Sequence, residues 1–353
     1  MTREAENENA PRPAPLVEVW RGRVIESRHR GHVAAVDGDG RLVAHAGEPE
    51  TVTYLRSSGK PFQAIPLLTS GAADHFGFDE TELAVACGSH SGEDIHAETV
   101  ARMLEKIGLD ESYLKCGVHE PFDIATAERL RERGEKPTAL RNNCSGKHTG
   151  MLALALRIGA RPEEYDHADS PVQQSILRAV AKFSGLPAED IVVGTDGCGV
   201  PVFGMRVRSM ALMYARLAAP PADFEETLRA CARITAAMTS HPEMVGGTRE
   251  RFDTEVMRAC AGCFVSKIGA EGVYTAGVLP CERWPRGLGL AFKIEDGEDR
   301  RARSTIAIES LRQLDVLNED AQKALKPYAS FPVKNHRDEN VGEIRASFNL
   351  SRA

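Results

Sequence analysis

Residues 33–45 read Val33-Ala-Ala-Val-Asp-Gly-Asp-Gly-Arg-Leu-Val-Ala-His45 and join two short apolar runs through a turn rich in aspartate and glycine. Asp-Gly pairs between strand-like runs are typical of tight reversals of the chain. The surrounding segment, Leu16 to Ala46, alternates in polarity and favours strands. The N-terminal part of the chain is therefore predicted to form an antiparallel meander.

Helical patterns dominate the residues that follow. The polar stretch Arg56-Ser-Ser-Gly-Lys60 leads into an apolar run that begins with Pro61, a residue suited to the first turn of a helix. Ser57 is thus expected close to a helix N-terminus. Periodicity predicts further helices over residues 94–107, 148–158, 171–183, 222–238 and 251–260.

Strand signals return near the C-terminus, over residues 272–279, 288–294 and 341–348, with a helix expected over 304–314. Strands at both ends and helices between them predict an α+β fold, in which one antiparallel sheet collects the terminal strands. The helical middle, approximately residues 60–262, would form a second lobe, with a cleft where the lobes meet. Residues 1–15 are expected to be a disordered tail, and residues 16–353 one domain.

Composition excludes several classes of protein. The 353 residues carry a net charge of −7, which argues against nucleic acid as a partner because such binding needs clustered basic residues. No apolar stretch is long enough to cross a membrane, and the start of the chain lacks the pattern of a secretory signal. We therefore expect a cytoplasmic protein whose eight cysteines are thiols and whose partner is a small molecule.

The spacing Ser57-x-x-Lys60 places two side chains about one helical turn apart. A serine becomes a nucleophile when an adjacent base takes its proton, and a lysine can be that base if burial keeps it neutral. The alternative for the motif alone is a helix N-cap followed by a solvated lysine.

A second motif, Cys87-Gly-Ser-His-Ser-Gly-Glu93, follows the strand-like Leu83-Ala-Val-Ala86 and precedes a helix. Ser89 is a candidate for a second hydroxyl that relays protons, and a simple capping turn with Ser91 or Asp94 as N-cap is the alternative. His90 is a weaker candidate for a general base, since a lone histidine in a turn usually makes only a structural hydrogen bond.

Two further motifs carry ligand-like side chains. Arg141-Asn-Asn-Cys-Ser-Gly-Lys-His148 opens a helix, and Gly194-Thr-Asp-Gly-Cys-Gly-Val-Pro201 forms a glycine-rich loop after a short strand. Their thiols and their nitrogen and oxygen donors suit zinc, although buried structural thiols are the alternative. From the residues alone, His148 or Asp196 is preferred to Lys147 as a third ligand, because lysine must lose its proton to coordinate. Cys260 and Cys263, spaced as a CxxC pair, are expected to pack in the core.

Lys267 lies in Ser266-Lys-Ile-Gly-Ala-Glu-Gly272, just before a predicted strand. If it faces the cleft near Lys60, repulsion between the two cations would lower the proton affinity of both. An exposed loop lysine is the alternative.

Together, Arg56–Pro61, Cys87–Glu93, Asn142–His148, Asp196–Pro201 and Lys267–Gly272 resemble, in order, the motifs of the asparaginase II family, the class 3 or rhizobial-type inducible L-asparaginases. The resemblance runs from about residue 16 to the C-terminus. It implies a fold similar to serine β-lactamases and glutaminases, a homodimer, and hydrolysis of the side-chain amide of L-asparagine. The segment Gly246-Gly-Thr-Arg-Glu-Arg-Phe-Asp-Thr254 departs from the family pattern, in which a shorter link is expected.

The resemblance also implies roles for individual residues. Ser57 would be the nucleophile and Lys60 its base, with Ser89 and Lys267 as a second serine-lysine tandem. The zinc ligands would be Cys144, Lys147 and Cys198, supporting substrate binding. Arg56, Asp196 and His90 are expected at the substrate. Two competing functions share parts of this pattern: an acyl-serine hydrolase of the β-lactamase or peptidase type, and a non-catalytic zinc or amino-acid sensor.

Overall fold

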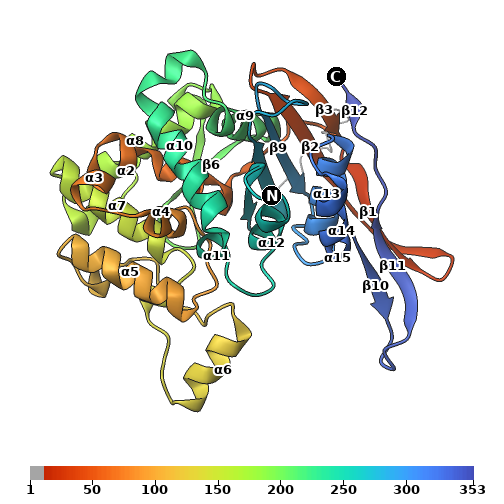
Figure 1. Cartoon of the computed structure of the whole chain (residues 1–353), viewed down its shortest axis with the longest axis horizontal. Coiled ribbons are helices and arrows are strands. Elements are labelled where there is room, and N and C mark those ends of the chain that lie inside the picture. The colour runs from red at the N-terminus through yellow and green to blue at the C-terminus, as the bar shows by residue number, and fades with distance from the viewer. Residues whose placement is uncertain (1–11) are drawn as a thin grey trace, which may run out of the picture.

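A computed structural model describes residues 12–353 and contains one large, curled sheet with helices on both faces (Figure 1). Its main path runs β10-β11-β1-β2-β9-β8-β7, with antiparallel neighbours, and β3 pairs with both β2 and β12. The strands are β1 (Ala14–Arg21), β2 (Val24–Asp37), β3 (Leu42–Ala46), β7 (Phe264–Gly269), β8 (Val273–Val278), β9 (Leu288–Ile294), β10 (Ser330–Lys334), β11 (Asn340–Ala346) and β12 (Ser351–Arg352). The α+β prediction, with one sheet built from both ends of the chain, is confirmed.

The predicted reversal at residues 37–40 joins β2 to β3. The Asp37 side chain fixes this turn by accepting hydrogen bonds from the backbone N–H groups of Asp39 and Arg41, each at 2.9 Å. The turn sets a register in which Val33 pairs with Ala46. Local sequence therefore determines this hairpin.

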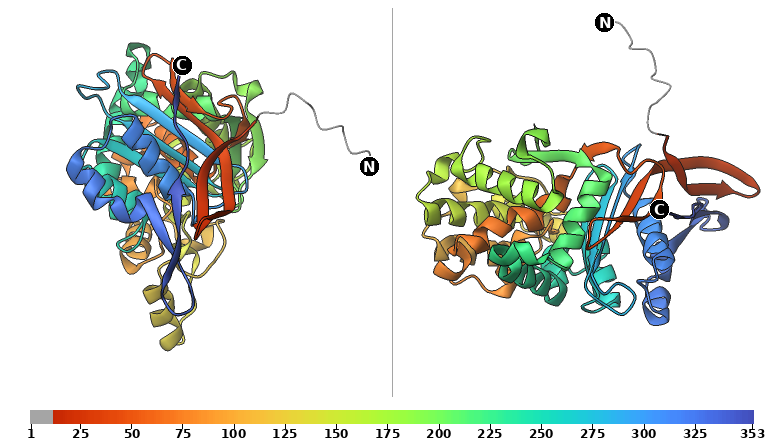
Figure 2. Two further views of the ribbon diagram at one scale, coloured as in Figure 1. Left: turned by 90° about the vertical axis from the view of Figure 1, so that its right-hand side faces the viewer. Right: turned by 90° about the horizontal axis from the view of Figure 1, so that it is seen from above.

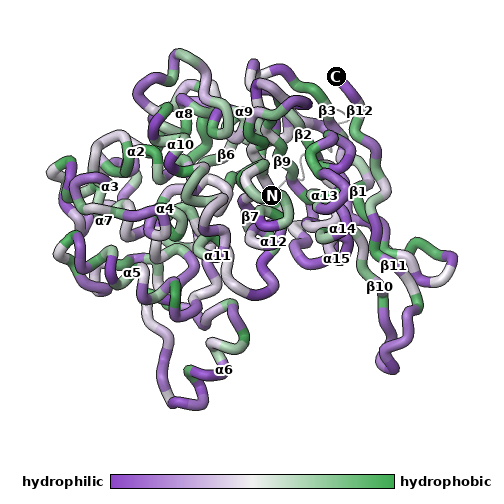
Figure 3. Tube along the Cα trace, in the orientation of Figure 1, coloured by the Kyte–Doolittle hydropathy of each residue, from purple (hydrophilic) through white to green (hydrophobic). Residues whose placement is uncertain are grey.

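The run Val33–Val36 is apolar without interruption because both faces of β2 are covered. Side chains alternate along a strand. Ala34 and Val36 pack in the core of the helical lobe, whereas Val33 and Ala35 pack in a second core on the opposite face. Figure 3 shows hydrophobic strands in the centre of the molecule and a hydrophilic tip on the β10–β11 hairpin.

The helical lobe fills the middle of the chain and lies on one side of the sheet (Figures 1 and 2). Its helices are α1 (Lys60–Gln63), α2 (Ile65–Thr69), α3 (Ala72–His75), α4 (Glu80–Ala86), α5 (Asp94–Lys106), α6 (Ile124–Glu132), α7 (Ser145–Ile158), α8 (Pro171–Ser184), α9 (Val207–Ala218), α10 (Glu225–Ser240) and α11 (Pro242–Val245). Short 3-10 turns are η1 (Arg56–Gly59), η2 (Glu111–Tyr113), η3 (Ala139–Arg141), η4 (Pro162–Glu164), η5 (Ala188–Asp190) and η6 (Ala222–Phe224).

Helix α9 joins the lobe to the sheet, where it packs across β9, β8 and β2. A Cβ at Gly289 on β9 would overlap the backbone carbonyl of Ala211, so glycine permits this close approach. The second core, on the other face, is closed by α13 (Arg303–Gln313), α14 (Glu319–Ala324) and α15 (Lys326–Ala329), while α12 (Phe252–Ala259) lies beside β7. The right-hand view of Figure 2 shows the sheet between these two groups of helices.

A separate small sheet places two of the predicted motifs. It has the order β4-β6-β5 and consists of β4 (Val52–Tyr54), β6 (Pro201–Arg206) and β5 (Val192–Thr195). Strand β4 ends just before Arg56, and β5 ends just before Asp196. Because these strands share the neighbour β6, the two motifs emerge close together.

Several expectations need correction. Leu83–Ala86, predicted as strand-like, belongs to helix α4, whose start is fixed by a capping box between Asp79 and Glu82. Helix α9, with Val207, Met210 and Tyr214 on one buried face, was not predicted. The expected helix over 61–68 is divided into α1 and α2, with Pro66 in the first turn of α2.

Of the CxxC pair expected in the core, Cys260 is buried but Cys263 is exposed, because it lies in the turn between α12 and β7. The predicted helices agree with the described residues. The helices predicted from residues 94, 148, 171, 222, 251 and 304 correspond to α5, α7, α8, α10, α12 and α13. Residues 1–11 of the expected tail lie outside the described residues, and β1 begins at Ala14 within it. None of the helices over residues 12–353 has the length and apolar character of a membrane span.

Candidate active site

The Ser57 motif forms a strained turn between the two sheets. Turn η1 packs against β6, β7 and β8, and Arg56 has a φ of 51°, a left-handed conformation that is costly for a residue with a Cβ. Two hydrogen bonds hold the turn: Ser58 Oγ donates to the Leu55 carbonyl at 2.5 Å, and the Tyr214 hydroxyl donates to the Ser58 carbonyl at 2.7 Å. Ser57 remains partly exposed at this turn.

Lys60, three residues later, is buried and points into a polar pocket. Its Nζ atom lies 2.6 Å from the Gly88 carbonyl, 2.9 Å from the Asn143 carbonyl and 2.8 Å from Ser89 Oγ. Burial lowers the pKa of Lys60 against the opposing effect of the nearby Cys144 sulfur. A neutral amine can donate to both carbonyls and still accept a proton from Ser89, so this pocket suits a lysine that acts as a base.

The expected contact between Lys60 and Ser57 is replaced by the contact between Lys60 and Ser89. Among the hydrogen bonds of residues 12–353, none joins Lys60 Nζ to the Ser57 hydroxyl. The structure therefore brings Ser89, from the second predicted tandem, to the lysine of the first.

The turn that carries Ser89 follows α4 and is held rigidly. The Ser89 N–H donates to the Val245 carbonyl at 2.8 Å, and Arg251 Nη2 donates to the Ser89 carbonyl at 2.6 Å. A Cβ at Gly88 would meet the Met244 carbonyl at 2.7 Å, so this position needs glycine. The N-cap of the next helix, α5, is Glu93 rather than Ser91 or Asp94.

His90 lies behind this turn, fully buried. Its Nδ1 accepts from the Gly92 N–H at 3.2 Å, which places the proton on Nε2, 3.0 Å from Ser145 Oγ. Burial holds the pKa of His90 well below its ordinary value, so the ring is neutral. These contacts indicate that His90 supports the turn from behind, in the way expected of a structural histidine.

The predicted metal ligands meet beside Lys60. Lys147 Nζ lies 2.9 Å from Cys198 Sγ, and Cys144 lies close enough to Cys198, Lys60 and Lys147 for these groups to affect its ionisation. The neighbouring Cys198 side chain, together with the charges of Lys60 and Lys147, lowers the pKa of the Cys144 thiol well below its ordinary value, although burial opposes the shift. Cys144 and burial raise the pKa of the Cys198 thiol, although Lys147 opposes the shift.

The donor set of two thiols and an amine fits zinc in its chemistry, and the Lys147 amine is in contact with the Cys198 thiol. Lys147 would have to lose its proton to bind zinc, and its pKa is raised by Cys144 and Cys198 against the effect of burial. His148, the alternative ligand, instead hydrogen-bonds the Tyr165 hydroxyl through Nδ1 at 2.6 Å. Over residues 12–353, no group of three or more His, Cys, Asp and Glu side chains is arranged to hold a metal.

Asp196 connects the thiols to the serine turn. Its Oδ1 accepts from Arg56 Nε at 2.9 Å, and its Oδ2 lies 3.9 Å from Cys198 Sγ. Although burial opposes it, Lys147, the Gly197 N–H and Arg56 hold the pKa of Asp196 below its ordinary value. An ionised carboxylate and a guanidinium thus lie next to Ser57.

Lys267 is neither exposed nor in a loop: it lies in β7 with no solvent-accessible surface. Burial lowers its pKa to about 8, opposed by Asp253 and assisted by the charge of Lys60. A lowered pKa is the shift expected when two lysines lie near one another.

Sequence reasoning missed two residues of this region. Asp253 contacts Lys267 at 3.2 Å, and Arg251 reaches the Ser89 carbonyl. Both belong to the Arg251-Phe-Asp-Thr254 segment, which had been noted only for its departure from a pattern. Arg251 and Asp253 are otherwise two charged residues in a predicted helix, and that pattern does not indicate a role in a site.

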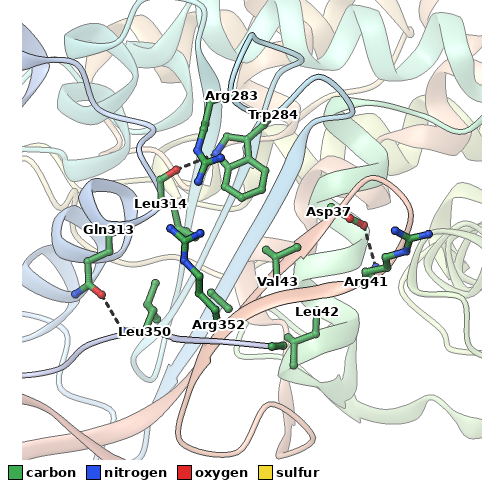
Figure 4. Close-up of a pocket in the computed structure, with 12 residues that line it drawn as sticks. Asp37, Arg41, Leu42, Val43, Arg283, Trp284, Gln313, Leu314, Leu350 and Arg352 are labelled. Atoms are coloured by element: carbon green, nitrogen blue, oxygen red, sulfur yellow. Dashed lines mark hydrogen bonds between the residues drawn. The ribbon is translucent and has the colours of Figure 1, made fainter.

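Of two hollows on the protein surface, one adjoins the candidate site and the other does not. One of about 570 Å³ is lined by Ser91, Phe122, Asp123, Arg249 and Arg251, and Arg251 links it to the Ser89 turn. Another, of about 450 Å³, lies between β3, the C-terminal residues and Arg283-Trp284 (Figure 4). It contains none of the predicted site residues.

The sequence of the chain matches a known protein family. A family model described as L-asparaginase II matches residues 17–346. No curated protein sequence matches the chain.

Solved structures with a similar course of the chain include glutaminases. A probable glutaminase from Bacillus subtilis complexed with 6-diazo-5-oxo-L-norleucine is 12% identical, with a TM-score of 0.40 and coverage of 81% of this chain and 85% of that chain. The covalent complex of the Bacillus subtilis glutaminase YbgJ with 5-oxo-L-norleucine is 14% identical, with a TM-score of 0.39 and coverage of 81% and 87%. Native Mglu is 15% identical, with a TM-score of 0.43 and coverage of 83% and 66%.

Proposed function

The chain belongs to the L-asparaginase II family and is an amidohydrolase, and on this premise we propose that it hydrolyses the side-chain amide of L-asparagine to L-aspartate and ammonia. The observation that carries the proposal is the buried Lys60, whose Nζ lies 2.8 Å from Ser89 Oγ beside the strained Ser57 turn. A lysine deprived of solvent and paired with a hydroxyl is suited to activate a serine.

Ser57 is the proposed nucleophile because it is the more accessible of the two serines. Ser57 is partly exposed, whereas Ser89 is 4% exposed and Lys60 is 1% exposed. A substrate can therefore reach Ser57 more readily than it can reach the buried Ser89 and Lys60. This order favours a relay in which Ser89 passes the proton of Ser57 to Lys60.

The reaction then has two halves. Ser57 Oγ attacks the carboxamide carbon, its proton passes through Ser89 to neutral Lys60, and backbone N–H groups of the turn stabilise the oxyanion. The C–N bond breaks as the proton on Lys60 moves to the leaving nitrogen, which departs as ammonia. Water next attacks the aspartyl ester, Lys60 takes its proton by the same route, and Ser57 leaves with that proton.

Arg56 and Asp196 are proposed to bind the amino-acid end of the substrate. They form an ion pair of 2.9 Å next to Ser57 and remain partly accessible. A guanidinium suits the α-carboxylate, and a carboxylate suits the α-ammonium group. His90 is proposed to contribute to substrate binding indirectly, by supporting the turn that carries Ser89.

Zinc is proposed to bind Cys144, Lys147 and Cys198. When bound, the metal would supply positive charge near the substrate site and order the loop that carries Asp196. A cytoplasmic location remains a prediction from the composition of the sequence, and a homodimeric assembly remains a prediction of the family resemblance.

Ammonia release from L-asparagine, measured beside L-glutamine, tests the proposed function. Wild type is expected to release ammonia from asparagine at a higher kcat/KM than from glutamine, and Ser57→Ala is expected to release none. Ser175→Ala, which alters a partly exposed serine on α8, is the matched control and is expected to retain wild-type turnover. Absence of turnover in zinc-supplemented wild type would overturn the proposal and favour a binding protein.

A further inference from the structure

Asp253 is a buried carboxylate that holds three consecutive residues of β7. It is 1% exposed and lies in the first turn of α12. Ser266 Oγ donates to Oδ1 at 2.8 Å, Lys267 Nζ lies 3.2 Å from Oδ2, and the Ile268 N–H contacts both oxygens, at 3.0 and 3.1 Å. A charge buried to this depth is stable only with such a set of partners.

The position of β7 explains why a side chain can bind its backbone. β7 is the last strand on one side of the sheet, paired with β8 alone along the main path. The outer edge of such a strand presents N–H groups that no neighbouring strand satisfies. Asp253 satisfies one of them at Ile268, and the same carboxylate thereby meets Lys267.

Lys267 lies on the face of β7 that is turned toward the proposed site. Side chains two residues apart share a face of a strand, and Val265 packs in the core of the helical lobe. Turn η1, which carries Ser57, also packs against β7. The Lys267 ammonium group thus lies on the side of the strand that supports the Ser57 turn.

Lys267 Nζ makes two hydrogen bonds with the described residues, to Asp253 and to the Ile268 carbonyl at 3.0 Å. An ammonium group has three donors, so a third position is left for a reacting group. The direction of that third position depends on the two contacts that fix Nζ.

We propose that Asp253 is a positioning residue of the reaction, whose carboxylate fixes Lys267 Nζ against the edge of β7 and keeps its third position directed into the site. This inference rests on the proposed amide hydrolysis and adds to it a residue outside the recognised motifs. Asp253 acts through Lys267 and does not contact the substrate.

The charges around the pair determine the sign of its pH dependence. Lys60, Arg251 and Cys87 interact electrostatically with Lys267, and Arg251, Tyr214 and Tyr274 interact with Asp253, which also accepts the hydrogen bond from Ser266. Burial, Lys60 and Arg251 lower the pKa of Lys267, and Asp253 raises it. Removing the carboxylate charge should therefore lower the pKa of Lys267 below about 8.

Asp253→Asn, compared with wild type, tests the proposal. The limb of the kcat/KM pH profile near pH 8 should move to lower pH by about one to three units. A shift of this size is expected when an opposite charge at this distance is removed. We expect kcat to fall about tenfold or more while KM stays nearly constant, because misplacement affects the reacting geometry rather than binding. Glu82→Gln removes another buried carboxylate, paired with Lys106, and should leave the profile unchanged.

Two further measurements separate this inference from the proposed function. NMR of 13Cε-labelled lysine reports the titration of Lys267 whether or not asparagine is the substrate, and Lys267→Met assigns the signal. An active Asp253→Asn enzyme with an unshifted Lys267 titration would overturn the inference alone. If Asp253→Asn fails to fold, Asp253→Glu decides: it keeps the charge but displaces it, so kcat should fall with the limb in place, and wild-type kcat would overturn the proposal.

Discussion

Lys60 Nζ lies 2.8 Å from Ser89 Oγ, although the two residues are 29 positions apart and Ser57 is only three positions from Lys60. The lysine of one serine-lysine motif thus serves the serine of another. Ser57, Ser89 and Lys60 are therefore proposed to act as one unit, which the following variants test.

Replacing Lys60 should abolish most turnover without unfolding the protein. A positioned base contributes about 10²–10⁴ in rate, so Lys60→Ala and the better-filling Lys60→Met should lose at least that factor in kcat. Lys106→Met, which alters a lysine paired with Glu82 away from the site, is the control. Turnover of Lys60→Met within a factor of ten of wild type would exclude Lys60 as the base.

Arg56 offers a test that separates binding from backbone strain. Arg56→Ala and Arg56→Gly both remove the guanidinium and should raise KM for asparagine, with a smaller effect on kcat. Because φ is 51° at this position, Arg56→Gly should be more stable than Arg56→Ala by about 1 kcal/mol in urea unfolding. Equal stability of the two variants would argue against strain at this turn.

The thiol pair predicts a change in metal content. Cys144→Ser and Cys198→Ser should each lower the zinc content, measured by elemental analysis of purified protein, and should raise KM more than they lower the melting temperature. Cys231→Ala removes a buried thiol on α10 and should keep wild-type zinc. Zinc that persists in both site variants would contradict the proposed ligands.

Stability should rise with pH because of Lys267. Its pKa in the folded state is about 8, below the ordinary value of 10.5, so the unfolded chain binds more protons between these values. This contribution to the free energy of unfolding is present above the unfolded pKa and is lost as the pH falls through about 8, with a size of roughly 3 kcal/mol. Between pH 8 and pH 10, the free energy of unfolding measured in urea should rise more in wild type than in Lys267→Met. An equal rise in both proteins would contradict the lowered pKa of Lys267.

Local sequence determines the parts of the fold in which neighbouring residues act on one another. The Asp37 turn, bonded by its own side chain, and the periodic helices such as α8, capped by Ser170, follow from nearby residues. Leu83–Ala86 was misjudged because four apolar residues suit a strand or a helix equally, and the Asp79–Glu82 capping box decided the outcome.

The candidate site depends on contacts between distant segments, which spacing cannot supply. The interval from Ser57 to Lys60 predicts a contact between neighbours. Instead, the buried Lys60 Nζ contacts carbonyls and a hydroxyl in the turn after α4 and in the segment just before α7. Asp253 gives no sequence signal because its role arises only where α12 meets the edge of β7. The resemblance to a family, rather than spacing, placed Lys147 with the cysteines.

Covalent trapping tests most directly whether Ser57 is the nucleophile of this unit. A diazoketone analogue of asparagine should alkylate the attacking hydroxyl, and peptide mass spectrometry should locate the adduct on Ser57 in wild type. Ser89→Ala should still be labelled at Ser57, though more slowly, because the relay is lost while the nucleophile remains. An adduct on Ser89, which persists in Ser57→Ala, would contradict the account and make the serine beside Lys60 the nucleophile.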